Sequence, residues 1–179
     1  MTWHKHCHFT DKHSDARSIK SLPWRPPLEQ TLVLIKPDGV QRGLIGAIIK
    51  RLEQRGLRII GMKFVQVSPA LAEKHYSIHK DKPFYDTLIA FITSAPVVAI
   101  AWQGNRAVSV VRQTLGATDP TEAEPGTIRG DYGVDIGRNL THGSDSAQNG
   151  KTEVELWFTT EELVNWERIG ENWVFEENN

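Results

Sequence analysis

Apolar residues along this chain follow two spacings, and each spacing predicts one kind of element. Short apolar runs predict four strands, at 31–36, 57–67, 96–102 and near 141–144. Helical spacing and its end signals predict four helices, at 44–55, near 70–78, near 84–93 and at 105–116. The first of these helices would share one apolar face among Leu44, Ile45, Ile48, Ile49 and Leu52.

The order of these elements predicts the fold class. With residues 70–93 set aside as an inserted helical hairpin, the remaining order is strand, helix, strand, strand, helix, strand. This is the ferredoxin-like split βαβ arrangement, an α/β (α+β) fold with an antiparallel four-stranded sheet and helices on one sheet face. The loop from 117 to 140 is too long for a mere connection, and such loops are usually functional. Residues 152–158 alternate as a strand would, so their pattern alone is ambiguous.

Candidate chemistry centres on His142. The stretch Gly137–Ser146 sets this histidine between flexible positions, with hydroxyl, amide, carboxylate and guanidinium groups around it. An imidazole is mostly unprotonated near neutral pH, and a neighbouring carboxylate can decide which ring nitrogen is free. The stretch therefore suggests a nucleophile or a proton shuttle. The alternative is a solvent-facing turn histidine without a chemical role.

Three cationic residues extend this hypothesis. Lys36 leaves the end of a buried strand at a turn that Pro37 and Gly39 favour, Arg129 sits in a rigid turn, and Arg112 precedes the long loop. Each of them taken singly could be an ordinary surface charge. Together they supply the guanidinium forks and the ammonium group that a polyphosphate requires.

Four motifs occur in one order along the chain, KPDGVQRGLIG at 36–46, HYSIHKDKPF at 75–84, PGTIRGD at 125–131 and GRNLTHGSDS at 137–146. In these motifs the chain strongly resembles the nucleoside diphosphate kinase family, over residues 30–176. The resemblance implies the same ferredoxin-like fold, with a helix after the histidine. We therefore expect residues 152–158 to be helical.

The resemblance also implies a reaction. The γ-phosphate of a nucleoside triphosphate, usually ATP, would pass to His142 and then to a second nucleoside diphosphate, in a ping-pong mechanism through phosphohistidine. Expected partners are ATP, GDP, UDP, CDP and their deoxy forms. Mg²⁺ would bridge the nucleotide phosphates without a direct protein ligand, because no carboxylate cluster has the spacing of a metal site.

Residue roles follow from the matching motif positions. The catalytic group implied by the resemblance is His142 as nucleophile, with Lys36, Tyr76, Ser144 and Glu153. The nucleotide-binding group contains cations, residues that bind phosphate or ribose, and two residues that hold the base. Stacking on an aromatic ring discriminates little between bases. Its members are Lys36, Phe84, Arg112, Thr118, Arg129, Ile136 and Asn139. For Glu153, a solvated helix face is an equally good interpretation of the sequence alone.

Some features depart from the family pattern or suggest another function. Ala117 replaces a usual acidic residue, Tyr85 stands where Phe is common, and the pair Asn149 and Gly150 would loosen the helix that carries Glu153. Residues 149–152 resemble the end of a phosphate-binding Walker loop, but position 145 is Asp where that loop needs Gly. The alternative function is a noncatalytic nucleotide-binding or regulatory protein with the same fold.

Composition limits the expected partners and cellular location of the protein. The chain has 179 residues, is 39% hydrophobic, and has a formal net charge of -1, so we expect neither nucleic acid nor a membrane as partner. Its single cysteine excludes an intrachain disulfide and favours a cytoplasmic location.

The domain organisation is expected to be simple. Residues 1–28 would be a poorly ordered extension with a weak metal-binding candidate in its His4, His6 and His8 cluster, and residues 29–179 would be the kinase domain. The resemblance implies a homo-oligomer, as a hexamer or a tetramer.

Overall fold

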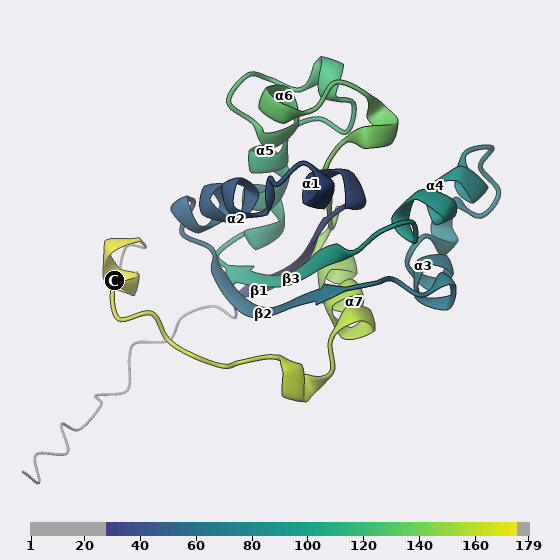
Figure 1. The fold of residues 1–179 in the computed structure, drawn as a ribbon. Helices are drawn as coiled ribbons and strands as arrows, with labels where there is room; N and C mark the ends of the chain where they lie inside the picture. Colours follow the sequence, from purple (N-terminus) through teal and green to yellow (C-terminus); the bar gives the residue numbers. More distant parts are fainter. Residues whose placement is uncertain (1–27, 175–179) are drawn as a thin grey trace, which may run out of the picture.

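The computed structural model describes residues 28–174, so the expected N-terminal extension and its histidine cluster lie outside the described residues. Its strands are β1 (Glu29–Ile35), β2 (Arg58–Val65), β3 (Val97–Gly104) and β4 (Thr141–Gly143). They form one sheet in the order β2-β3-β1-β4, and every neighbouring pair is antiparallel (Figure 1). This confirms the expected fold class.

The helices are α1 (Pro37–Gln41), α2 (Ile45–Gln54), α3 (Pro69–His75), α4 (Tyr85–Ile92), α5 (Ala107–Leu115), α6 (Ile128–Tyr132) and α7 (Ala147–Trp157). The turn expected after Lys36 is in fact the start of α1, with proline at its first position, where a missing N–H costs nothing. The long loop is not structureless, because it contains α6 and short 3-10 turns at Pro120–Glu122 and Ile136–Arg138.

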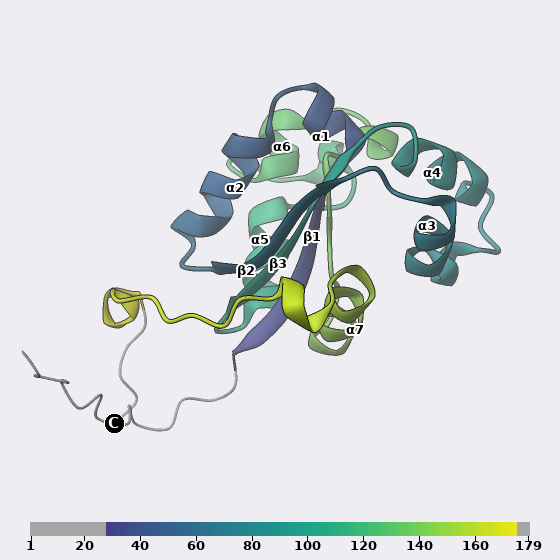
Figure 2. The same cartoon turned by 60° about the horizontal axis from the view of Figure 1, so that its bottom comes forward.

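Helices cover both faces of the sheet, which corrects the expectation of helices on one face. In β1, Val33 and Ile35 pack toward α2 and α5, whereas Leu32 and Leu34 pack toward α3, α4 and α7. Figure 2 shows α2 and α5 on one side of the strands and α7 on the other. A sheet that is apolar on both faces must bury both, which explains the unbroken apolar run of β1.

The segment after the histidine is helical, as the family resemblance implies, although its sequence alternates like a strand. Ser146 caps α7 by accepting a hydrogen bond from the backbone N–H of Asn149 at 3.1 Å. Gly150 does not loosen the helix. A Cβ atom there would collide with the backbone oxygen of Gln30, so the glycine lets α7 lie directly against β1.

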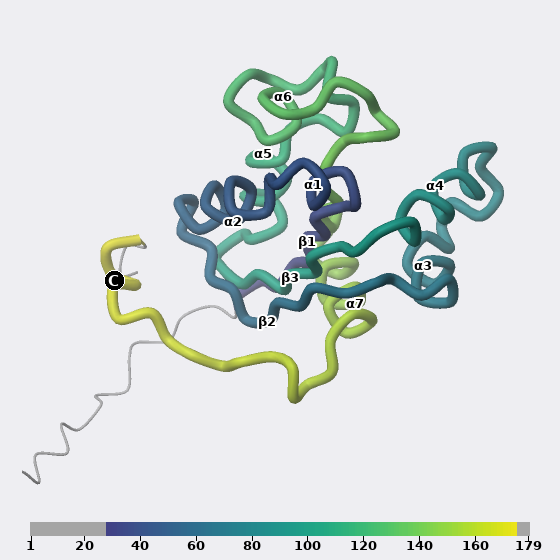
Figure 3. Tube along the Cα trace, in the orientation of Figure 1, coloured from purple at the N-terminus to yellow at the C-terminus, as the bar shows by residue number. Residues whose placement is uncertain are grey.

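The C-terminal segment returns to the edge of the sheet. It runs past β2 (Figure 3). There the backbone N–H of Val164 donates to the oxygen of Ile60 at 2.7 Å, and the indole N–H of Trp166 donates to the oxygen of Ile59 at 2.8 Å. These contacts satisfy part of the edge that β2 would otherwise expose. Within residues 28–174, none of the helices has the length and apolar character needed to cross a bilayer.

Candidate active site

A cavity of about 530 Å³ opens between the α3–α4 hairpin, the long loop and β4. It is large enough for a nucleotide-sized ligand. Most residues expected at the site from the sequence line this cavity, namely Lys36, Tyr76, Phe84, Arg112, Thr118, Arg129, Ile136, Asn139, His142 and Glu153. Ser144 is fully buried behind them.

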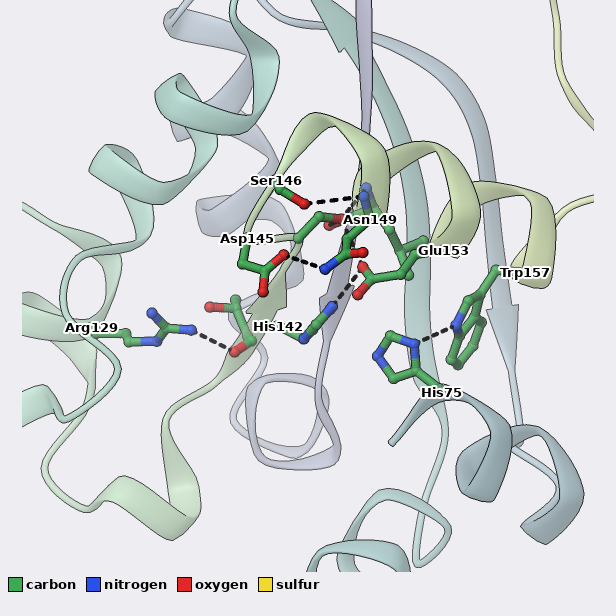
Figure 4. Close-up of polar contacts among 11 residues, drawn as sticks. His75, Arg129, His142, Asp145, Ser146, Asn149, Glu153 and Trp157 are labelled. Carbon is green, nitrogen blue, oxygen red and sulfur yellow. Dashed lines mark hydrogen bonds and ion pairs between the residues drawn. The ribbon is translucent and has the colours of Figure 1, made fainter. Parts of the chain in front are cut away.

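His142 lies on β4 beside β1, opposite Leu34, and its ring is held from α7. Its Nε2 atom lies 2.9 Å from Oε2 of Glu153 (Figure 4). The hydroxyl of Ser144 donates to the same oxygen at 2.7 Å. Ser144 is itself anchored, because its Oγ accepts from the backbone N–H of Leu32 at 3.1 Å. A carboxylate only accepts, so Nε2 of His142 carries the proton and Nδ1 keeps its lone pair.

The backbone just before His142 has a strained conformation that Asp38 supports. Leu140 has φ of 69°, in the left-handed region that an apolar side chain rarely adopts. Its N–H donates to Oδ2 of Asp38 at 2.9 Å, and its oxygen accepts from the backbone N–H of Lys36 at 2.8 Å. The motif of residues 36–39 therefore holds the kink that separates Asn139 from His142.

Lys36 is buried at the end of β1 and donates from Nζ to Oδ1 of Asn139 at 2.7 Å. Asn139 in turn donates to the backbone oxygen of Thr118 at 2.9 Å, which ties the long loop to the strand. Burial lowers the pKa of Lys36 to about 8, and the nearby guanidinium groups of Arg129 and Arg138 act in the same direction.

Arg129 is also buried, and backbone oxygens occupy much of its guanidinium. It donates to Asn139 at 3.2 Å, to Gly116 at 2.7 Å and to Thr141 at 2.8 Å. Burial, with the charge of Arg112 nearby, lowers its pKa to about 10. Arg129 thus connects the backbone at residues 116–117 to the backbone at residues 139–141 beside the cavity, a role that its sequence context did not suggest.

The outer walls of the cavity are apolar. Phe84, before α4, is 51% exposed, and Ile136, in the long loop, is 56% exposed. Exposed apolar side chains on two walls of one cavity are suited to hold a flat ring. Arg138, which the sequence analysis did not single out, lies over the ring of Phe91 at 4.1 Å and joins the loop to α4.

Two aromatic residues from the end of α3 complete the inner wall. The hydroxyl of Tyr76 is buried, and burial together with Glu153 raises its pKa. Its neighbour His75 was missed by the sequence analysis. The two ring centroids of His75 and His142 are 4.5 Å apart, with the rings nearly perpendicular. His75 belongs to one of the motifs that indicate the family, next to Tyr76. Only the tertiary structure shows that it lies beside His142.

His75, His142 and Glu153 each offer one potential ligand atom, and these atoms lie within 4.8 Å of one another. Nitrogen-rich sets of this kind suit zinc-like ions better than Mg²⁺, which prefers oxygen ligands. The sequence predicts no direct metal ligand, and among the described residues this group is the one with the spacing of a metal site.

Comparisons with known proteins agree with this geometry. The family model described as nucleoside diphosphate kinase matches residues 29–163. The nucleoside diphosphate kinase of Synechococcus sp. (strain JA-3-3Ab) is 54% identical over 83% of this chain and 100% of its own length, and that of Archaeoglobus fulgidus is 52% identical over 84% and 99%. A solved halophilic nucleoside diphosphate kinase from Halobacterium salinarum, in complex with CDP, superposes with a TM-score of 0.82 at 53% identity, covering 83% of this chain and 99% of that one. The chain therefore belongs to the nucleoside diphosphate kinase family, and it is a nucleotide-binding phosphotransferase.

Proposed function

We propose that this enzyme transfers the phosphoryl group through His142 in two half-reactions. The lone pair of Nδ1 attacks the γ-phosphorus of a nucleoside triphosphate, and the bond to the bridging oxygen breaks with its electron pair leaving on the diphosphate. A terminal oxygen of a second nucleoside diphosphate then attacks the phosphorus, and the bond to Nδ1 breaks. The observation that carries this proposal is the contact between Nε2 of His142 and Glu153, which leaves Nδ1 as the nucleophile.

The cations of the cavity are proposed to stabilise the charge that develops during transfer. Lys36, Arg112 and Arg129 line the same cavity as His142, and phosphoryl transfer depends chiefly on positioning and on such electrostatic stabilisation. We assign Thr118 to phosphate binding, and Asn139 with Lys36 to the ribose hydroxyls. The hydrogen bond from Lys36 to Asn139 supports a shared task for these two residues.

Glu153 and Ser144 are proposed as positioning residues, because they hold the tautomer and orientation of His142. Tyr76 is proposed to donate its hydroxyl to the phosphoryl group, since the atom finds no partner among residues 28–174 and lies at the cavity wall. A donor that is unpaired in the resting enzyme is available to a ligand.

Phe84 and Ile136 are proposed to clamp the base. Stacking and apolar contact do not read base edges, so GDP, UDP, CDP and their deoxy forms should all serve as acceptors. ATP is the proposed donor.

Mg²⁺ is the proposed cofactor. The group formed by His75, His142 and Glu153 supplies two ring nitrogens and only one carboxylate, which does not match the oxygen preference of this ion. The nucleotide phosphates would hold the ion, and it would neutralise part of their charge.

We also propose a homo-oligomer, as a hexamer or a tetramer, in the cytoplasm. Met62 and Phe64 on the edge strand β2 are 55% and 63% exposed, which supports a surface that a second copy could cover. Light scattering coupled to size-exclusion chromatography would measure the oligomeric state.

The central test is mass spectrometry after incubation with ATP and Mg²⁺ in the absence of an acceptor. We expect one added phosphoryl group, mapped to His142, labile in acid and stable in base. His142→Asn should lose both the label and the turnover while keeping the melting temperature within a few degrees. Retention of more than trace exchange activity by that variant would rule out the covalent route.

A further inference from the structure

His75 is a buried histidine that the proposed transfer chemistry does not use. It ends α3, and its ring lies between the rings of His142 and Trp157, with centroid distances of 4.5 Å and 5.5 Å. Burial lowers the pKa of His75 to about 2, and the nearby charges of His142 and Lys36 act in the same direction. The ring is therefore neutral at any working pH, and it carries a single proton on one of its two nitrogens.

Trp157 decides which nitrogen carries that proton. Its indole N–H, which can only donate, lies 3.2 Å from Nδ1 of His75. Nδ1 must accept this hydrogen bond, so it is unprotonated and the proton resides on Nε2. The tautomer of His75 is thus set by a buried residue of α7.

The resulting Nε2–H of His75 has no acceptor among the residues that the structure describes. Figure 4 shows this nitrogen on the side of the ring that faces His142, away from Trp157. A buried donor without a partner costs free energy, and such groups in a folded protein call for a specific explanation. An acceptor that arrives during the reaction would explain it.

The tautomer also excludes a metal as this missing partner. A metal ion needs the lone pair of a ring nitrogen. Binding through Nε2 of His75 would move the proton to Nδ1, where it would oppose the indole N–H of Trp157. The three-residue group with His142 and Glu153 therefore lacks one usable ligand in the observed arrangement.

We propose that Trp157 holds His75 as a neutral Nε2–H donor to a phosphoryl oxygen of phosphorylated His142, so that His75 stabilises the phosphoenzyme relative to the free enzyme. This inference rests on the proposed function, because it requires the phosphoryl group on His142. Glu153 and His75 then have different roles. Glu153 holds the imidazole through Nε2 in both states, whereas His75 gains its partner only when the phosphoryl group is present.

Geometry and charge both suit this role. The ring centroids of His75 and His142 are 4.5 Å apart, so a phosphoryl group on His142 would lie beside the ring of His75. The oxygens of the phosphoryl group carry negative charge, and hydrogen bonds to charged acceptors are the stronger ones. A neutral donor has a further advantage over a cation at this position. It adds no positive charge beside His142, so the nucleophile stays available before transfer.

The test is the equilibrium of the first half-reaction, measured by quenching enzyme with defined ratios of ATP to ADP and quantifying acid-labile phosphate on His142. His75→Phe removes the donor, and we expect the ratio of phosphoenzyme to free enzyme to fall about tenfold or more at a fixed nucleotide ratio. His75→Gln is the matched control. Its side-chain oxygen can accept from Trp157 while its amide N–H donates toward the phosphoryl group, so the ratio should recover toward the wild-type value.

Trp157→Phe tests the tautomer lock with His75 left in place. We expect a smaller fall in the ratio than for His75→Phe, because the proton of His75 is then free to occupy either nitrogen. A merely structural role of His75 would lower the melting temperature of the free enzyme and the phosphoenzyme alike and leave their ratio unchanged. That result, with normal labelling of His142 in the wild type, would overturn this inference but not the proposed function.

A measurement on the wild type covers variants that fail to fold. With ¹⁵N-labelled histidine rings, the NMR signals of His75 should show a protonated Nε2 and an unprotonated Nδ1, and the Nε2–H proton should shift downfield on phosphorylation. A proton on Nδ1, or no shift on phosphorylation, would contradict the inference. Absence of label on His142 in the wild type would instead refute the proposed function.

Discussion

Nε2 of His142 and Oε2 of Glu153 lie 2.9 Å apart, although they belong to a strand and to a helix on opposite sides of the turn at Ser144. The contact determines which imidazole nitrogen is protonated. It also connects the position of α7 to the orientation of the nucleophile, so that anything that moves the helix should affect the reaction.

Glu153→Gln should therefore slow the formation of phosphoenzyme by about 10²-fold. The amide can turn its N–H toward Nε2 of His142, which would favour the tautomer with a proton on Nδ1 and block attack. Single-turnover kinetics with ATP measures this step directly. Glu155→Gln, on the exposed side of α7, is the control and should retain the wild-type rate. Equal rates for both variants would remove Glu153 from the mechanism.

Gly150→Ala should destabilise the protein by about 1–3 kcal/mol, because the new methyl group meets the backbone oxygen of Gln30 and forces α7 away from β1. Since α7 carries Glu153, the rate of phosphoenzyme formation should fall as well. Urea denaturation and single-turnover kinetics report the two effects. Gly46→Ala, in α2, where no atom lies near the new methyl group, should be neutral or stabilising. An unchanged free energy of unfolding in Gly150→Ala would contradict the close packing.

Lys36 should make kcat/KM for ATP decrease as the pH rises through about 8. Its pKa is lowered, so above that pH the ammonium group loses its proton and its attraction for phosphate. Lys36→Arg keeps its charge throughout this range, and it should show lower activity but a flatter profile between pH 7 and pH 9.5. If the wild-type decrease persists unchanged in Lys36→Arg, another group is responsible for it.

His75 should make the enzyme sensitive to acid. Its folded pKa of about 2 lies below the unfolded value of 6.5, so between these values the unfolded chain binds one more proton and acid favours unfolding. The stability that neutral His75 retains at neutral pH is lost as the pH falls below 6.5. His75→Gln cannot bind this proton. The slope of its unfolding free energy between pH 5.5 and pH 4 should be smaller by about 1.4 kcal/mol per pH unit. Identical slopes would show that His75 titrates normally in the fold.

Local patterns predicted the elements well where one residue spacing dominates. The apolar runs predicted strands β1 and β3, and the spacing of Ile48 and Leu52 predicted α2. The periodicity of the backbone alone determines which side chains share a face. The pattern of residues 152–158 was ambiguous, and only the family resemblance predicted the helix. In the structure the buried residues Val154 and Trp157 are three positions apart, as on one face of a helix, and the residues between them are partly or fully exposed.

The sequence by itself determined the chemical types at the site, namely a histidine between small residues, a lysine at a strand end and arginines near turns. These are local features, and their motifs also indicated the family. The covering of both sheet faces, the close contact of Gly150 with β1, and the hydrogen bonds of Arg129 to four backbone oxygens came only from the tertiary structure. They depend on which segments meet in space, and no spacing along the chain encodes that.

The pair of His75 and Trp157 shows the difference most clearly. The two residues are 82 positions apart, so no local pattern predicts their contact, and each alone resembles an ordinary core residue. Packing α3 and α7 on one sheet face brings the indole N–H to one ring nitrogen and turns the other toward His142. The direction of a hydrogen bond decides a tautomer, and direction exists only once the chain is folded.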